Sequence, residues 1–195
     1  MSFGKELILI RSELLRQHSE IDQTLTAPAH DVYSGFLYQA LDYETLSKAA
    51  KERALIQIVI FSALYGVLHL DDEISFYKFK IQSTLWKEKL RDCLVSSEQE
   101  LIVDCRSATY IAAWVPPAAN TVNIRVLTKV GGQTKVVTHM AKATRGKVTR
   151  FLLQNNLSFN TPQELEAELS KQFNCKLVQS HDKKRWTIDI LANYS

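Results

Sequence analysis

The stretch TVNIRVLTKVGGQTKVVTHMAKATRGKVTRFLL, residues 121–153, places two strands, a tight turn and a helix in immediate succession. The strands on either side of Gly131-Gly132 alternate apolar and polar side chains, and the two glycines supply the positive φ angles of a hairpin turn. A helix is predicted next, over 141–156. This part of the chain therefore predicts a β-hairpin that leads directly into a helix.

The remaining segments predict further strands and helices. ALIQIVIF (54–61) is β-branched and apolar on both faces, as in a central strand covered on both sides, and ELIVDCR (100–106) is a second short buried strand. An amphipathic helix is predicted over 84–96, and Thr161 reads as the N-cap of another helix. The chain ends in a second hairpin. We therefore expect a mixed α/β (α+β) fold in a single domain over 1–195, with a central mixed sheet, flanking helices and a C-terminal hairpin.

Several classes of protein are excluded by what the sequence lacks. No apolar run approaches the roughly 20 residues of a membrane helix, and the first residues lack the basic n-region, apolar core and cleavage site of a signal peptide. We therefore expect a cytoplasmic protein without membrane partners. Cys93, Cys105 and Cys175 are isolated, which is typical of reduced thiols in a cytosol. Glycine-rich nucleotide loops and metal-ligand spacings are absent, so we expect no cofactor and no metal.

The charge is distributed unevenly along the chain. Between Cys105 and Gln163 there is no Asp or Glu, although the window holds eight basic residues. All 21 acidic side chains, but only 16 of the 24 basic ones, lie outside it. A basic surface attracts polyanions or phosphorylated ligands. The alternative is an ordinary solvated surface that happens to lack acids.

The predicted helix raises a question of its own, because its first turns hold several cations and a glycine. Lys142 and Arg145 would oppose the helix dipole by about 0.3–1 kcal/mol each, and Gly146 costs about 1 kcal/mol relative to alanine. An anion bound there would offset the first penalty, and the glycine would allow close approach of a backbone or ligand. The alternative is a helix that starts near Lys147, with a loop before it.

Polar side chains follow the predicted strands. Tyr65 follows the first strand, Arg106 the second, and Lys142 comes after the hairpin. Because ligands bind beyond the carboxyl ends of strands in α/β sheets, these three endings are expected to converge on one cleft. Candidates for proton transfer are Asp104, His139 and Tyr65, although a lone histidine at a strand end is more often structural.

Four segments occur in an order that resembles a known family. They are DVYSGFLYQAL (31–41), VIFSALYGVLHLDDEISFYKF (59–79), LIVDCRSATYIAAW (101–114) and VVTHMAKATRGKVTRFLL (136–153). Together they resemble the YaaA-type peroxide-stress proteins, in particular the shorter actinobacterial branch. The resemblance covers about residues 24–153, and the N-terminal part of the family, with its helix-hairpin-helix segment, is expected to be missing.

This resemblance implies a YaaA-like fold with a positively charged cleft, in a protein of the oxidative-stress response that limits free iron and binds duplex DNA. The cleft residues carried over by motif are Tyr33, Gly35, Tyr65, Gly66, Asp72, Tyr77, Asp104, Arg106, Ser107, Tyr110, His139, Lys142, Arg145 and Gly146. The residues expected to contact nucleic acid or phosphate are Arg106, Lys142, Arg145, Lys147 and Arg150.

Three functions compete. The first is a stress protein that binds DNA or another polyanion through the acid-free stretch, weakly and with strong salt dependence. The second is an enzyme for a phosphorylated or nucleotide-like small molecule, in which Lys142 and Arg145 hold the phosphate, Arg106 and Tyr110 orient the substrate, and Asp104 or His139 transfers protons. The third, direct iron binding, has little support because no clustered ligand set is visible.

Overall fold

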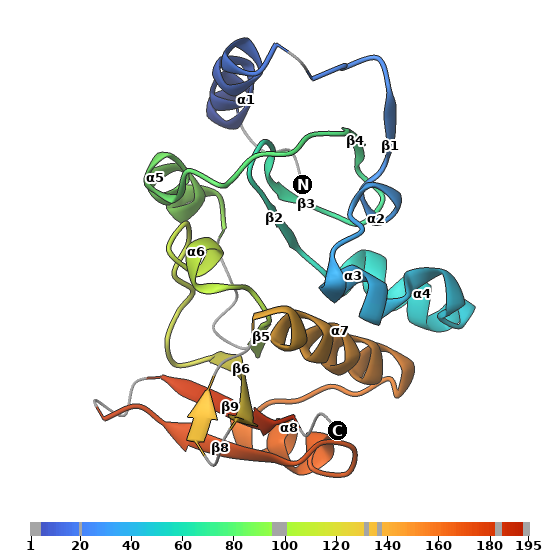
Figure 1. Cartoon of the computed structure of the whole chain (residues 1–195), viewed down its shortest axis with the longest axis vertical. Helices are drawn as coiled ribbons and strands as arrows, with labels where there is room; N and C mark the ends of the chain where they lie inside the picture. Colours follow the sequence, from blue (N-terminus) through green and yellow to red (C-terminus); the bar gives the residue numbers. More distant parts are fainter. Residues whose placement is uncertain are drawn as a thin grey trace. The chain divides into compact units, whose positions relative to one another are not determined.

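Strand β6 (Thr121–Val130) lies inside a five-stranded mixed sheet in the computed structural model of the chain (Figure 1). The strand order is β5-β6-β9-β8, and β7 (Gln133–Lys135) pairs with the end of β6. Strands β5 (Ile102–Asp104) and β9 (Trp186–Leu191) run parallel to β6, whereas β8 (Cys175–Gln179) runs antiparallel to β9. The structure describes residues 5–19, 21–94, 101–130, 133–135, 138–181 and 185–192.

One face of this sheet forms a hydrophobic core. Val122, Ile124 and Val126 of β6 are buried, because alternate residues of a strand point to the same face. Helices α7 (Thr138–Gln154) and α8 (Pro162–Leu169) contribute apolar side chains to the same core. The alternating sequence of β6 thus determines which face of the sheet these two helices cover.

Helix α3 (Phe36–Leu41) packs closely along α7 (Figure 1), at the position of Gly146. A Cβ atom at Gly146 would lie 2.1 Å from the carbonyl oxygen of Leu37 and 2.9 Å from the Cβ of Ala40. Both distances are below van der Waals contact, so any larger residue would push the two helices apart. The glycine within the basic helix therefore has a packing role against a backbone.

Helix α8 begins at the predicted N-cap Thr161, and the carboxylate of Glu164 bonds back to the residue before the cap. The Thr161 hydroxyl accepts the backbone N–H of Glu164 at 3.2 Å, and the Glu164 carboxylate accepts the N–H of Asn160 at 2.8 Å. Farther along the same helix, the Glu166 carboxylate accepts the N–H of Leu177 at 3.1 Å. Leu177 lies on β8, which is the last strand of the sheet order, so α8 engages the sheet at its edge.

Contacts within the chain divide it into two compact units. The first comprises Met1–Tyr33, Glu52–Val95 and Arg106–Val115, and the second comprises Ser34–Lys51, Ser96–Cys105 and Pro116–Ser195. The five-stranded sheet, α3, α7 and α8 belong to the second unit. Its mixed sheet, flanking helices and C-terminal β8–β9 hairpin confirm the predicted mixed α/β class. The single domain over 1–195 stays a prediction.

The first unit is built from short elements around a buried indole. Its elements are α1 (Lys5–Gln17), β1 (Thr26–Pro28), α2 (Ala29–Val32), β2 (Ile60–Ser62), β3 (Gly66–Leu68), β4 (Glu73–Ser75), α5 (Ser83–Cys93) and α6 (Ala108–Ile111). Strand β1 pairs with β4 and β2 with β3, both antiparallel. Trp86 is fully buried, and its ring would lie 2.7 Å from a Cβ at Gly66, whose φ of +79° favours glycine. The indole N–H donates to the Ala63 carbonyl at 3.0 Å.

The predicted central strand over 54–61 is wrong. Residues up to Gln57 belong to α4 (Lys48–Gln57), and the strand that follows, β2, pairs with β3 in a two-stranded sheet. The helix formers KAAKERAL precede the β-branched run, and they carry the helix into it. Ile56 is 79% exposed, so this segment is not covered on both sides.

The other main predictions are confirmed with shifted ends. Val130 pairs with Gln133 across the predicted hairpin, whose two glycines lie outside the described residues. Helix α7 begins at Thr138, so the alternative start near Lys147 is wrong, and Lys142 lies beyond the first turn, where the dipole effect fades. Within the described part of the chain, no helix has the length and apolar character needed to cross a membrane.

Replacing Gly146 with alanine is expected to lower the free energy of unfolding by about 1–3 kcal/mol, because overpacking outweighs the better helix propensity of alanine. Urea unfolding followed by circular dichroism measures this change. Gly35→Ala is the matched control, since nothing lies within 4 Å of a Cβ at that position. Its effect is expected to stay below about 1 kcal/mol. Equal stability of the two variants would contradict the packing role of Gly146.

Candidate functional site

The predicted site residues divide between the two units. The first unit contains Tyr33, Tyr65, Gly66, Asp72, Tyr77, Arg106, Ser107 and Tyr110. The second contains Gly35, Asp104, His139, Lys142, Arg145, Gly146, Lys147 and Arg150. The convergence of Tyr65, Arg106 and Lys142 on one cleft stays a prediction, because Lys142 belongs to a different unit from the other two.

The exposed lysines of α7 face different directions. Gly146 and Arg150 form the stripe of α7 that contacts α3. At about 100° per residue, Lys142 lies about 40° to one side of Gly146 and Lys147 about 100° to the other. Both lysines are exposed. They therefore flank the α3 contact on opposite sides, and a compact ligand on one flank would contact only one of them.

Arg145 shares the Lys142 side of α7 but is held by the sheet. Its Nε–H donates to the Ile124 carbonyl of β6 at 3.0 Å. Burial lowers the pKa of Arg145, while the nearby Cys105 and Asp104 act in the opposite direction. An arginine keeps its charge at neutral pH even so. A partly desolvated cation with one anchored nitrogen is thus fixed beside the exposed Lys142.

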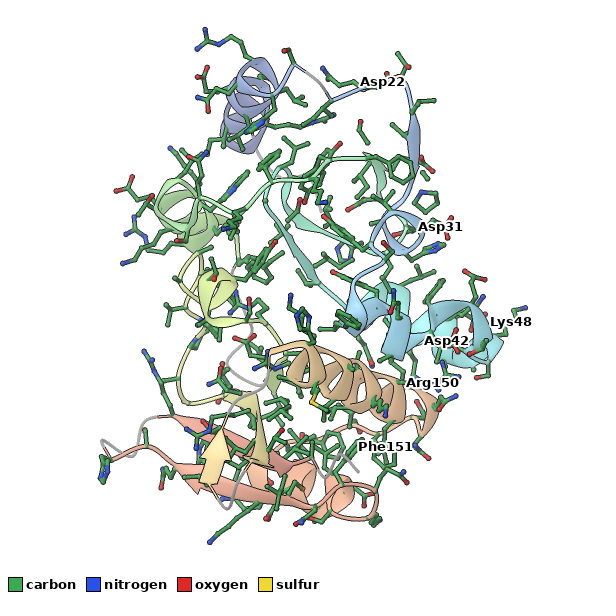
Figure 2. The ribbon with its side chains drawn as sticks, viewed as in Figure 1. Asp22, Asp31, Asp42, Lys48, Arg150 and Phe151 are labelled. Atoms are coloured by element: carbon green, nitrogen blue, oxygen red, sulfur yellow. The ribbon has the colours of Figure 1, made fainter. Side chains whose placement is uncertain are left out.

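Arg150 closes the C-terminal end of α3. Its guanidinium donates to the carbonyl oxygens of Leu41 at 2.8 Å and Asp42 at 2.7 Å, and to the hydroxyl of Thr45 at 2.8 Å. Figure 2 shows Arg150 beside Asp42, where α3 ends and the short 3-10 helix η1 (Tyr43–Thr45) begins. Unpaired carbonyls at a helix C-terminus are commonly satisfied by such a cation. Arg150 therefore has a structural role that the sequence pattern did not indicate.

Asp104 and Cys105 lie at the carboxyl end of β5, on the side of α7 that carries Arg145. Asp104 is only 4% exposed. Thr149 of α7 donates its hydroxyl to the Cys105 sulfur at 3.7 Å. Burial raises the pKa of Cys105 to about 11, so its thiol is protonated at neutral pH. A protonated thiol is a poor nucleophile and a poor metal ligand.

His139 lies in the first turn of α7 and is exposed. Its ring makes an edge contact with Phe36 of α3, with the ring centroids 5.1 Å apart. This contact adds to the packing of α3 against α7. The exposed position leaves the imidazole accessible to solvent, while its role as a proton carrier stays a prediction.

Tyr77 is the centre of a hydroxyl network in the first unit. Its phenol oxygen lies 2.8 Å from the hydroxyl of Tyr33 and 2.7 Å from that of Ser62, and it accepts the N–H of Ala63 at 3.2 Å. Ser62 is fully buried and accepts two backbone N–H groups, from Leu64 at 3.3 Å and Tyr65 at 3.0 Å. The network is made of hydroxyls and amides, which are weak ligands for transition metals.

Tyr65 forms a second contact in the same region. Its hydroxyl accepts the backbone N–H of Ser75 at 2.9 Å, which ties β4 to the turn after β2. The guanidinium of Arg11, from α1, lies 4.7 Å from the centroid of the Tyr65 ring. A cation over a phenol ring is an attractive contact. Tyr65 thus holds together three separate elements of the first unit.

Arg106 packs against two aromatic rings that stack on each other. Its guanidinium carbon lies 4.0 Å from the Phe61 ring centroid and 5.4 Å from that of Trp114. The same group donates to the carbonyls of Tyr110 at 3.3 Å and Trp114 at 3.0 Å, which fixes the turn around α6. Burial, and then Tyr77, raise the pKa of Tyr110. Ser107 begins α6 by accepting the Tyr110 N–H through its backbone carbonyl.

Asp72 stabilises the turn that precedes it. Its carboxylate accepts the backbone N–H of His69 at 2.7 Å. Sequence reasoning missed Ser62, the fully buried hydroxyl that connects Tyr77 to the backbone. Its signal was a single polar residue inside the apolar run VIFSAL, at 59–64. A buried polar residue needs partners, and that requirement could have identified it.

Comparison with known proteins identifies relatives across most of the chain. A family model described as Peroxide stress protein YaaA matches residues 5–177. A UPF0246 protein of Streptomyces coelicolor is 31% identical over 209 residues, covering 97% of this chain and 79% of the relative. UPF0246 proteins of Corynebacterium glutamicum and Corynebacterium efficiens are 32% and 35% identical, covering 79% and 72% of this chain. The matched region spans 67% and 62% of those two relatives.

Cys105 is expected to react slowly with alkylating reagents in the folded protein. With a pKa of about 11, about one thousandth of the thiol is ionised at pH 8, against about a quarter for an unperturbed cysteine. Iodoacetamide labelling followed by mass spectrometry of the Cys105 peptide measures the rate. We expect labelling at least about 100-fold slower in buffer than in urea. Equal rates in the two conditions would show that the thiol is accessible and ionised.

Replacing Arg150 with alanine is expected to lower the free energy of unfolding by about 1.5–3 kcal/mol, since the carbonyls at the end of α3 lose a charged donor. Chemical unfolding measures the loss. The exposed Lys147 offers a matched control, and Lys147→Ala is expected to change stability by less than about 0.5 kcal/mol. An Arg150 variant as stable as the Lys147 variant would overturn the capping role.

Proposed function

This chain belongs to the family of the peroxide stress protein YaaA, and we propose that it binds DNA, as a polyanion, through one side of α7. The side in question carries Lys142 and Arg145, and we call it the Lys142 side. The observation that carries the proposal is the fixed, partly desolvated Arg145 next to an exposed lysine, on a helix of 17 residues without a single acid.

The chemistry of the Lys142 side suits phosphate. Among the described residues, Arg145 donates through Nε to Ile124, which leaves its two terminal amino groups for a ligand. Arg145 is already partly desolvated, so it loses less hydration on binding an anion than an exposed arginine does. Arginine presents a planar fork to phosphate oxygens, and Lys142 adds a mobile point charge.

Such a surface supports contacts with the phosphate backbone rather than base readout. A lysine and an arginine on one helix flank neutralise about two phosphates, so the logarithm of affinity is expected to fall with the logarithm of salt with a slope of roughly −2. Contacts of this kind position a protein on DNA without reading sequence. Binding is therefore expected to be weak and independent of sequence.

The experiment compares Lys142→Ala with Lys147→Ala in duplex binding by fluorescence anisotropy, at several salt concentrations. The two variants remove the same charge from the same helix, on opposite flanks of the α3 contact. We expect Lys142→Ala to weaken binding and reduce the salt slope by about 1, while Lys147→Ala has the smaller effect. Lys80→Ala, at an exposed position in the first unit, controls for net charge.

Equal losses in the three variants would indicate nonspecific attraction and contradict the Lys142 side as a site. No binding at low salt would remove DNA as the ligand. Thermal stabilisation by nucleotides or sugar phosphates, lost in Lys142→Ala, would then favour the alternative, an enzyme acting on a phosphorylated small molecule. In that case the buried Asp104 beside Arg145 becomes the first residue to test for proton transfer.

A further inference from the structure

Two tyrosines of the first unit share a hydrogen bond between their phenol groups. The hydroxyls of Tyr33 and Tyr77 lie 2.8 Å apart, and their rings are nearly perpendicular, with centroids 6.4 Å apart. Both side chains are partly buried. The pair joins residues 44 positions apart in the sequence, from the end of α2 and the segment after β4.

The direction of this hydrogen bond follows from a count of lone pairs. Ser62 has two lone pairs, and the N–H groups of Leu64 and Tyr65 occupy both. The Ser62 hydroxyl therefore donates its proton to Tyr77, whose oxygen also accepts the N–H of Ala63. With two donors on its oxygen, Tyr77 directs its own proton at Tyr33. The result is a directed chain from Ser62 through Tyr77 to Tyr33.

Further aromatic rings surround Tyr77. The Tyr65 ring centroid lies 6.0 Å from that of Tyr77, and the Phe79 centroid lies 5.1 Å away. Phe79 in turn stacks on His18 at 4.2 Å. Phenols are among the side chains most easily oxidised by one electron, and loss of the electron requires a place for the phenol proton. The phenol proton of Tyr77 has such an acceptor, because it points at the hydroxyl oxygen of Tyr33.

We propose that the Tyr33–Tyr77 pair is an oxidation site, at which a one-electron oxidant of the hydroxyl-radical class forms a covalent dityrosine link. The site lies in a different unit from the Lys142 side, so the inference does not rest on DNA binding. The pair reacts with the oxidant directly. The product is a covalent cross-link between the residue that ends α2 and the segment after β4.

The reaction balances in four steps. A hydroxyl radical takes the hydrogen atom of the Tyr33 hydroxyl, which yields water and a Tyr33 phenoxyl radical. Tyr77 then passes its hydroxyl hydrogen atom to the Tyr33 oxygen across the 2.8 Å hydrogen bond, so the radical moves to Tyr77. The Tyr77 oxygen keeps the hydrogen bonds from Ser62 and Ala63, which stabilise the radical.

A second hydroxyl radical takes the hydrogen atom of the restored Tyr33 hydroxyl and again leaves as water. The two phenoxyl radicals then couple through their ortho carbons, and the ortho hydrogens shift to the oxygens as the rings regain aromaticity. The protein loses two hydrogen atoms in total and gains one carbon–carbon bond. Because the hydroxyls are already in contact, the ortho carbons beside them are the nearest available partners for coupling.

The test oxidises the full chain, at low protein concentration, with photolysed ruthenium tris-bipyridine and persulfate. Dityrosine fluorescence and peptide mass spectrometry are the readouts. We expect a linked peptide that joins the segments of Tyr33 and Tyr77 within one chain, with the mass of two hydrogens lost. Tyr33→Phe is expected to abolish that peptide, whereas Tyr43→Phe, in the other unit, is expected to leave it unchanged.

Tyr33→Phe is preferred to Tyr77→Phe because the Tyr77 hydroxyl also accepts hydrogen bonds from Ser62 and from the Ala63 N–H. Removal of that hydroxyl is expected to destabilise the fold. Circular dichroism of the variants verifies that they fold. A cross-link that joins other tyrosines, or that joins separate chains, would overturn the proposal. So would dityrosine of unchanged yield in a folded Tyr33→Phe variant.

Discussion

The missing side chain at Gly146 is the constraint on which the packing of α3 against α7 depends. With a backbone carbonyl only 2.1 Å from the place of a Cβ, the two helices approach as closely as their backbones allow. That approach brings the end of α3 within reach of Arg150 and sets Phe36 against His139. The absence of a side chain at Gly146 thus allows the contacts that Arg150 and His139 make with α3 and the residues at its end.

The cations of α7 consequently separate by chemistry. The arginines hold backbone carbonyls: Arg145 on the β6 side and Arg150 on the α3 side. The lysines, Lys142 and Lys147, extend into solvent. A guanidinium has several donors in a rigid plane and can satisfy more than one carbonyl at once, whereas an ammonium is strongly hydrated and is better placed outside. The arginines of this helix therefore stabilise the fold, and its lysines contribute positive charge to the exposed surface.

The sequence was informative where the signal is local. Alternation in β6, the pairing of β6 with β7 and the N-cap at Thr161 follow from neighbouring residues, and the structure has all three. The β-branched run after residue 54 led to a wrong strand prediction, because the helix formers before it extend α4 to Gln57.

Partners that depend on the tertiary fold could not be predicted. Arg150 bonds to residues more than 100 positions away, and Ser62 to Tyr77 across 15. No periodicity encodes such pairs. Most residues brought forward by the family resemblance do have defined contacts, but those contacts are largely structural, and the sequence motif could not distinguish a binding role from a packing one.

The Glu166 carboxylate on the N–H of Leu177 has a consequence for the behaviour of the protein at high concentration. An outermost strand offers unpaired amides to any other chain that arrives as a strand, and that is a common first step in aggregation. On β8 one of those amides is already occupied by a side chain of α8, which also carries a negative charge. A second strand would have to displace the carboxylate and bury its charge. Helix α8 thereby disfavours the pairing of β8 with a strand of another copy of the chain.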